Sequence, residues 1–229
     1  WKRVRKFLGS LTLGAVILGI TLSTLHQSGL GALFLMAKNK IHPLWYSEFI
    51  PILFFVSSIF AGLSMVIFEG SISQRVFKSQ ISPGHRAAHD DIIIGLARVC
   101  AGTMYIYFFL KVLVFVHGQQ WTYINTPLGY WFLLEIVGFV LIPVRLFTQA
   151  IQFGNLSLIR VASVLTLIGI VLNRLNVSVI AYKWYAPTHY VPSWMEIEIT
   201  LAVVAAEILV LRWIVNRMPI LREPPQWAT

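Results

Sequence analysis

The chain has 229 residues, of which 57% are hydrophobic and 12% are charged, and its formal net charge at pH 7 is +9. Soluble domains carry roughly 25% charged residues, so this chain has too few to cover a water-exposed surface. A basic chain could bind nucleic acid, but its basic residues lie at the ends of apolar runs and form no open patch. The composition therefore predicts an integral membrane protein and no nucleic-acid partner.

Apolar runs long enough to cross a bilayer recur along the chain. A transmembrane helix needs about 20 mostly apolar residues. Six runs meet this requirement, and they leave no sizeable soluble domain: 7–25, 49–69, 92–116, 128–147, 159–182 and 195–215. We therefore expect one all-α transmembrane domain, a polytopic integral membrane helical bundle of six transmembrane helices.

The distribution of Lys and Arg predicts the orientation of these helices. Outside the runs, twelve basic residues fall on one side, whereas only Lys38, Lys40 and Lys183 fall on the other. Loops on the cytoplasmic side are enriched in Lys and Arg, so both termini are predicted to be cytoplasmic. The chain starts at Trp1 without an initiator Met, which indicates a fragment of a longer protein.

The outward segment 26–48 is long for a link between two helices. Within it, residues 30–37 are too few to cross the membrane and too apolar for water, so we expect them to lie in the interface or to re-enter the membrane. Gly29 and Gly31 are predicted to end the first helix. Thr126 before Pro127 has the pattern of a helix N-cap, and Pro143 predicts a kink in the fourth run.

Ionisable residues inside or at the ends of the runs are the candidate functional residues, because each costs at least ~2.5 kcal/mol in a bilayer and needs a partner or a use. From the outer to the inner face they are His26, Glu135, Arg174, Arg98 and Glu69. One interpretation is structural: Glu69 pairs with Arg98, and Arg174 pairs with Glu135 or Glu207. The other is a proton path, since Glu and His exchange protons and Arg adjusts their pKa values. The residues alone leave both open.

Metal and haem ligands are few. Cys100 is the single cysteine, so no disulfide or thiolate cluster can form, and no metal site is predicted. The histidines lie at or beyond the ends of the runs, so a pair of haems spanning the membrane is not expected, while one outer haem stays open. A haem b cytochrome is thus an alternative function. A secondary transporter is a weaker one, because no inverted repeat is evident.

Several longer motifs, taken together, resemble one known family. They are "STLHQSGLGALFLMA", "KIHPLWYS", "IPILFFVSSIFAGLSMVIFEGS", "LNRLNVSVIAY" and "PSWMEIEIT". In this order they resemble the NrfD/polysulfide-reductase membrane family. The nearest likeness is its HybB-type branch, the membrane subunit of periplasm-facing nickel–iron hydrogenases. HybB-type chains look like ten-span proteins, and this chain resembles their last six spans.

The resemblance implies a respiratory redox complex in the cytoplasmic (inner) membrane of a bacterium or archaeon. Such a subunit passes electrons between a periplasmic, ferredoxin-like iron–sulfur subunit and quinone (menaquinone or ubiquinone), usually without haem, and is not catalytic without the catalytic subunits. Its quinone pocket would lie mainly in a front bundle that this chain lacks. The resemblance also favours proton handling by His26 and Glu69. The loop with His42, Pro43, Trp45 and Tyr46 is predicted to dock the iron–sulfur subunit.

Overall fold

The computed structural model describes residues 2–76, 83–187 and 192–217. Within these ranges the chain is helical, and its only β-type pairing is an isolated bridge between Ile41 and Tyr182. The elements are α1 (Lys2–Leu33), η1 (Phe34–Ala37), α2 (Ile50–Val76), α3 (Pro83–His117), η2 (Gln120–Tyr123), α4 (Pro127–Ile136), η3 (Val137–Leu141), α5 (Ile142–Phe153), α6 (Leu156–Leu175), η4 (Asn176–Ile180) and α7 (Trp194–Arg217).

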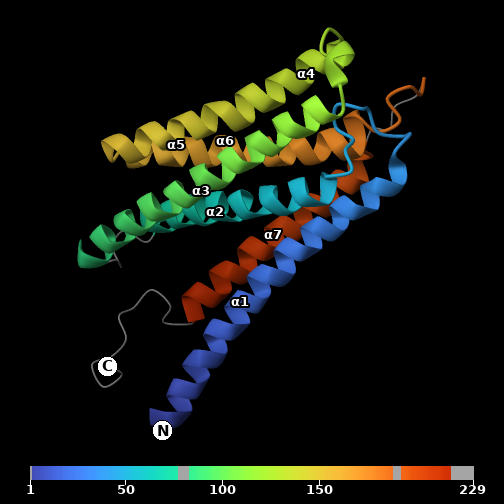
Figure 1. Ribbon diagram of the computed structural model, residues 1–229. Coiled ribbons are helices and arrows are strands. Elements are labelled where there is room, and N and C mark those ends of the chain that lie inside the picture. Colours follow the sequence, from blue (N-terminus) through green and yellow to red (C-terminus); the bar gives the residue numbers. More distant parts are fainter. Residues whose placement is uncertain (1, 77–82, 188–191, 218–229) are drawn as a thin grey trace.

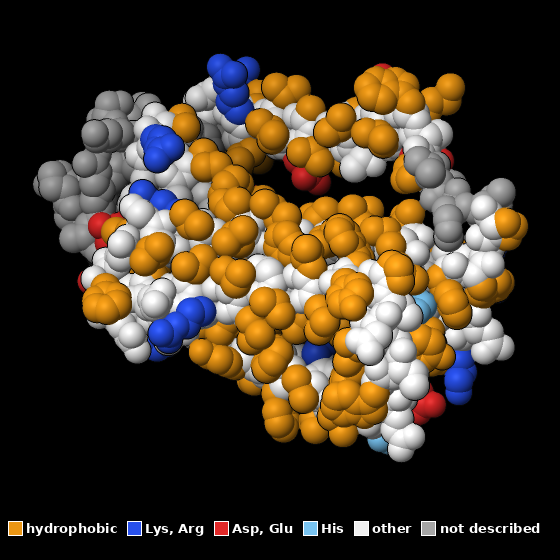
Figure 2. Space-filling model, turned by 90° about the horizontal axis from the view of Figure 1, so that it is seen from above, with side chains coloured by type: hydrophobic (Ala, Val, Ile, Leu, Met, Phe, Trp, Pro, Cys, Tyr) orange, Lys and Arg blue, Asp and Glu red, His pale blue; other side chains and the backbone are white. Residues whose placement is uncertain are grey.

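Four long rods form a bundle: α2, α3, α6 and the rod made by α4, η3 and α5 (Figure 1). Helix α1 packs against α2 near its own C-terminal end and diverges from the bundle toward its N-terminus. Hydrophobic side chains cover most of the face seen in Figure 2, and charged side chains are scattered over it. A surface of this kind suits lipid, which confirms a multi-pass helical membrane protein.

Five helical segments of the described chain are long and apolar enough to cross a membrane. They are Leu11–Ala37, Ile50–Val76, His89–His117, Pro127–Phe153 and Leu156–Ile180. The sixth predicted run, 195–215, falls in α7, which forms a helix of 24 residues but is not among these five. Its crossing of the membrane, like the cytoplasmic position of the termini, stays a prediction.

The junction between α1 and α2 differs from the sequence-based expectation. Helix α1 continues through Gly29 and Gly31 to Leu33, so the prediction that these glycines end the helix was wrong. A Cβ atom on Gly31 would lie 3.0 Å from Phe54 Cβ and 3.0 Å from Pro51 Cα. Gly31 therefore allows α1 to approach the start of α2 closely, and residues 30–37 continue α1 and its 3₁₀ turn.

The fourth rod begins and changes its winding where its sequence predicts. Thr126 caps α4, because its Oγ1 accepts a hydrogen bond from the Gly129 N–H at 3.0 Å and Pro127 occupies the first turn. The irregularity associated with Pro143 is the π-helical segment η3, just before it. Proline has no N–H to donate back into the preceding turn, so a wider turn accommodates it.

Two hydrophobic clusters hold the bundle together. One lies between α2, α3, α5 and α6 and includes the fully buried side chains of Ile67, Met104 and Phe147. The other closes the opposite end of the bundle, where Ile41 and Trp45 pack with residues of α4 and η4. Polar side chains lie buried beside this second cluster, and they form the candidate site.

Candidate functional site

The segment 38–49 folds back over the end of the bundle and is fastened there by its backbone. The His42 N–H donates to the Ala181 carbonyl at 2.9 Å, and the Lys183 N–H donates to the Lys40 carbonyl at 2.6 Å. These two bonds attach the chain that follows η1 to the residues just after η4. The segment is therefore part of the folded core, and it directs the Trp45 side chain into the bundle.

Trp45 contacts a buried carboxylate through its indole. Its side chain is 2% exposed, and its Nε1–H donates to Glu135 Oε2 at 2.8 Å. The indole ring meets the Phe132 ring edge-on, with centroids 5.5 Å apart. Because Phe132 and Glu135 lie one turn apart on α4, the same indole packs against one of them and bonds to the other.

Glu135 is the centre of the site. It is 2% exposed, and both of its carboxylate oxygens accept hydrogen bonds. Asn173 Nδ2 donates to Oε1 at 2.6 Å, and Asn176 Nδ2 donates to Oε2 beside the Trp45 indole. Three N–H donors from two other parts of the chain thus converge on one carboxylate, which offsets the cost of burying it.

The two asparagines are held in one orientation by further bonds. Trp131 Nε1–H donates to Asn176 Oδ1 at 2.9 Å, and Arg174 Nη1 donates to Asn173 Oδ1 at 3.2 Å. Each amide therefore gives its N–H to Glu135 and uses its oxygen for another donor. Asn173 and Asn176 are three residues apart, on one face, where α6 changes into the π-helical η4.

Arg174 connects this centre to α2. Its Nη2 donates to Ser57 Oγ at 2.8 Å and to the Phe54 carbonyl at 3.5 Å. Its guanidinium lies 3.6 Å from the centroid of the Phe54 ring, a cation–π contact. Arg174 reaches Glu135 through the Asn173 amide, so the predicted pair is a linked network with no direct ion pair between the two described side chains.

A small cavity of about 10 Å³ lies beside Glu135. Tyr107, Thr166 and Asn173 are among the residues that line it. This volume is at the lower limit of the space that one water molecule needs, and the polar lining offers partners for it. The carboxylate therefore has a position next to it where a single water could carry a proton.

The other predicted site residues lie elsewhere. Glu69 and Arg98 are exposed, and no hydrogen bond or ion pair joins them within the described residues, so the predicted pair is not formed. Their depths along the helices match, but their directions around the helices do not: Ile67 and Ala97 are the buried neighbours there. His26 is also exposed, on α1.

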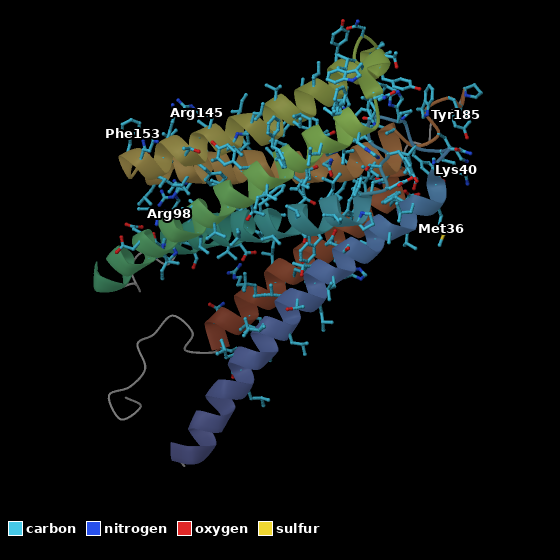
Figure 3. All side chains as sticks on the ribbon, viewed as in Figure 1. Met36, Lys40, Arg98, Arg145, Phe153 and Tyr185 are labelled. Carbon is cyan, nitrogen blue, oxygen red and sulfur yellow. The ribbon has the colours of Figure 1, made fainter. Side chains whose placement is uncertain are left out.

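Figure 3 shows the two ends of the bundle. Arg98, Arg145 and Phe153 lie toward one end, whereas Met36, Lys40 and Tyr185 lie toward the other. This separation agrees with the predicted order of depths, in which Arg98 is near the inner face and Lys40 is outside. Glu207, the alternative partner of Arg174, is exposed on α7 and belongs to no such network among the described residues.

Several side chains of the site were not predicted, Lys111 and Trp45 among them. Lys111 lies inside the apolar run 92–116, is 7% exposed, and has its ammonium facing the rings of Tyr107 and Phe132. Its charge inside an apolar run was the available signal. Trp45 was assigned to the outer surface, because an aromatic residue in a loop gives no sign that it turns inward.

His42 is buried beside the site, at the end of the bundle that segment 38–49 covers. Its ring lies 4.9 Å from the Trp184 ring and 5.2 Å from the Tyr123 ring, centroid to centroid. Its Nδ1 accepts a hydrogen bond from the Leu44 N–H at 3.3 Å. Burial lowers the pKa of His42 below its usual value of 6.5. Of the predicted docking residues, His42 and Trp45 are thus in the core, while Pro43 and Tyr46 are half-buried.

Known proteins resemble this chain over its whole length. The family described as polysulphide reductase, NrfD, matches residues 1–186. A protein of Nitratidesulfovibrio vulgaris, described only as "Protein", is 42% identical over 228 residues, which are 99% of this chain and 59% of that protein. The "Probable Ni/Fe-hydrogenase 2 b-type cytochrome subunit" of Escherichia coli K12 is 26% identical over 98% of this chain and 56% of that protein. No solved structure matches.

These matches agree with the likeness drawn from the motifs, including the HybB-type branch. The chain spans less than two thirds of the length of the curated relatives it matches. The family match covers most of the bundle, including α2 to η4 and the residues that surround Glu135. The chain therefore belongs to the NrfD polysulphide reductase family of membrane proteins.

Proposed function

We propose that this chain is the part of a redox-complex membrane subunit that handles protons while electrons pass between a periplasmic iron–sulfur subunit and quinone. Family membership and the relative named as a hydrogenase cytochrome subunit support a role in a redox complex. The observation that carries the proton role is the Glu135 network. An ionisable group in the middle of a membrane bundle is costly, and such groups mark proton relays.

The network can hold a proton acceptor in a fixed position. Glu135 Oε2 accepts two hydrogen bonds, whereas Oε1 accepts one from Asn173 and keeps a lone pair. A proton can therefore add at Oε1 without displacing a donor, and the water-sized cavity beside the carboxyl offers a route to it. The asparagines and Trp45 do not exchange protons; they orient the carboxyl.

His26, Arg98 and Glu69 remain proposed members of the path at its ends. Their side chains are exposed, so they do not form part of the buried network. Exposed His and Glu residues near the ends of helices can exchange protons with water on either side, while Arg98 adds a fixed positive charge at the depth of Glu69. Quinone, whether menaquinone or ubiquinone, would bind mainly outside this chain.

Docking of the iron–sulfur subunit is proposed at the outer end of the bundle. There, a pocket of about 420 Å³ lies between segment 38–49 and the end of α3, and its lining includes Lys38, Tyr46 and His117. The polar and aromatic lining resembles the rim of a protein interface. Catalytic subunits would bind through that partner.

A haem b cytochrome is the second candidate, because the printed name of the E. coli relative includes a b-type cytochrome. One optical spectrum of the purified full-length protein distinguishes the candidates. A haem band that grows with reduction favours the cytochrome, and a spectrum without one favours the quinone-linked subunit.

The proton role is tested by Glu135→Gln in the assembled complex. The amide keeps the size of the carboxyl but does not titrate. We expect electron transfer to an artificial acceptor to remain, and quinone-linked turnover to fall by about 10²-fold or more, as for a lost acid–base group. Glu207→Gln, at the exposed carboxyl on α7, is the matched control. Wild-type turnover in Glu135→Gln, with an unaltered pH profile, would contradict the proposal.

A further inference from the structure

Lys111 is a buried cation that the Glu135 network does not use. It lies in α3, within a segment long and apolar enough to cross a membrane, and is 7% exposed. Its Nζ lies 5.9 Å from the centroid of the Tyr107 ring and 5.5 Å from that of the Phe132 ring. Aromatic faces attract a cation, but two such contacts replace little of the hydration that an ammonium loses.

Two charged side chains on neighbouring helices act on Lys111, and their charges are opposite. Tyr107 lies one turn before it on α3, and Glu135 lies one turn after Phe132 on α4. The Glu135 carboxylate attracts the Lys111 ammonium, and the Arg174 guanidinium on α6 repels it. Within the described residues no direct ion pair joins Lys111 to Glu135, whose carboxylate oxygens accept from Trp45, Asn173 and Asn176 instead.

Glu135, Arg174 and Lys111 differ in how firmly they are held and in how readily they exchange a proton. Glu135 is fastened by three N–H donors, and Arg174 is fastened by Ser57, Asn173 and the Phe54 ring. An arginine guanidinium does not lose its proton in proteins, whereas a buried lysine gains and loses one readily. With Arg174 present, two cations would face a single carboxylate whenever Lys111 is charged.

We propose that Lys111 is a second group, beside Glu135, that gains and loses a proton in this cluster, and that Arg174 is its fixed positive charge. The inference rests on the proposed proton role of this site and adds a proton-carrying residue to it. The neutral amine accepts one proton on Nζ to become the ammonium, and releases the same proton to water on return. An ionised Glu135 attracts the ammonium form, and the fixed charge of Arg174 opposes it.

Two substitutions at Lys111 separate a proton carrier from a fixed charge. Lys111→Met keeps an unbranched chain and removes the amine, whereas Lys111→Arg keeps a positive charge that cannot be released. We expect both to slow quinone-linked turnover of the assembled complex by about tenfold or more, with electron transfer to an artificial acceptor intact. Lys40→Met, at an exposed lysine of the outer segment, is the matched control. Full turnover in Lys111→Arg would overturn the proposal, because a fixed charge would then suffice.

The Glu135→Gln variant, assayed in parallel, separates this inference from the proposed function. Slow turnover in Glu135→Gln with normal turnover in both Lys111 variants would overturn the role of Lys111 and keep the proton role of the site. Normal turnover in all three would overturn both.

A measurement on the wild-type complex covers the case in which the Lys111 variants do not assemble. Infrared difference spectra between the oxidised and reduced complex, with and without ¹⁵N-lysine, detect a change between amine and ammonium. We expect a label-sensitive band pair, since the other described lysines lie in the exposed outer segments or at the end of α1. A redox difference spectrum without any label-sensitive band would overturn the proposal.

Discussion

At the scale of single residues, the site depends on side chains that satisfy one another. Trp45, Asn173 and Asn176 each donate to Glu135, and the amide oxygens are occupied by Arg174 and Trp131. Removing one partner of such a network leaves another polar atom buried without its bond. The same hydrogen bonds therefore stabilise this end of the bundle and fix the position of the carboxylate.

Trp45→Phe tests this dependence, because it keeps an aromatic ring against Phe132 and removes the indole N–H. We expect the free energy of unfolding to fall by about 1–3 kcal/mol, since Glu135 Oε2 loses a donor. Thermal unfolding of the purified protein in detergent measures the change. Trp184→Phe, at a tryptophan that is 38% exposed, serves as control. Equal melting temperatures for both variants would show that the indole bond contributes little.

His42 predicts a pH dependence of stability. Burial lowers its pKa in the folded protein below the value of 6.5 expected in the unfolded chain. Between these two values the unfolded chain binds more protons, so stability is complete above about pH 6.5 and falls as the pH drops through that window. Protonation would also place an N–H on the Nδ1 that accepts from Leu44. Melting temperatures of wild type and His42→Asn between about pH 8 and pH 5 check this, and an unchanged slope in the variant would refute it.

At the scale of the elements, close packing and irregular turns position the site. The two π-helical segments adjoin the helices that carry the buried network: η3 follows α4, which carries Glu135, and η4 follows α6, which carries Asn173. A π-turn rotates the residues that follow it, and such turns occur often at functional sites. Here η4 begins at Asn176, so the turn itself presents one of the donors to Glu135.

Gly31 and Gly29 allow a matched test of the α1–α2 contact. Gly31→Ala places a methyl group 3.0 Å from Pro51 Cα and from Phe54 Cβ, so we expect stability to fall by about 1–3 kcal/mol. Gly29→Ala meets nothing within 4 Å and gains up to about 1 kcal/mol of helix propensity, so it should be neutral or stabilising. Only Gly31→Ala should lower the melting temperature, and an equal fall in both variants would contradict this packing.

At the scale of the whole molecule, the amino-acid sequence predicts the helices well and their faces poorly. Apolar runs predict which segments can cross the bilayer, so the five spans were predictable. Glu135 and Arg174 were predictable as site residues, because they are ionisable residues inside such runs. Glu69 and Arg98 were matched by depth alone, and depth does not say which way a side chain points around a helix. Trp45 was missed because its inward direction depends on the pairing of segment 38–49 with η4, a contact between distant parts of the chain.

The orientation of the molecule can be tested by cysteine labelling in intact cells. Cys100 is fully buried, so it should give little background. Lys40→Cys should react with a membrane-impermeant maleimide added outside, whereas Arg145→Cys should react only after the cytoplasmic side is opened. Both side chains are exposed and lie toward opposite ends of the bundle. Labelling of Lys40→Cys only from the cytoplasmic side would reverse the predicted topology.

In the proposed function, protons move through the cluster at Glu135 as electrons pass to quinone. The most direct measurement is the number of protons taken up per electron by the complex in sealed proteoliposomes, compared between wild type and Glu135→Gln. We expect Glu135→Gln to lose most of the proton uptake that accompanies turnover, while Glu207→Gln keeps the wild-type ratio. An unchanged ratio in Glu135→Gln, at an unchanged rate, would show that the buried network is structural and that protons take another route.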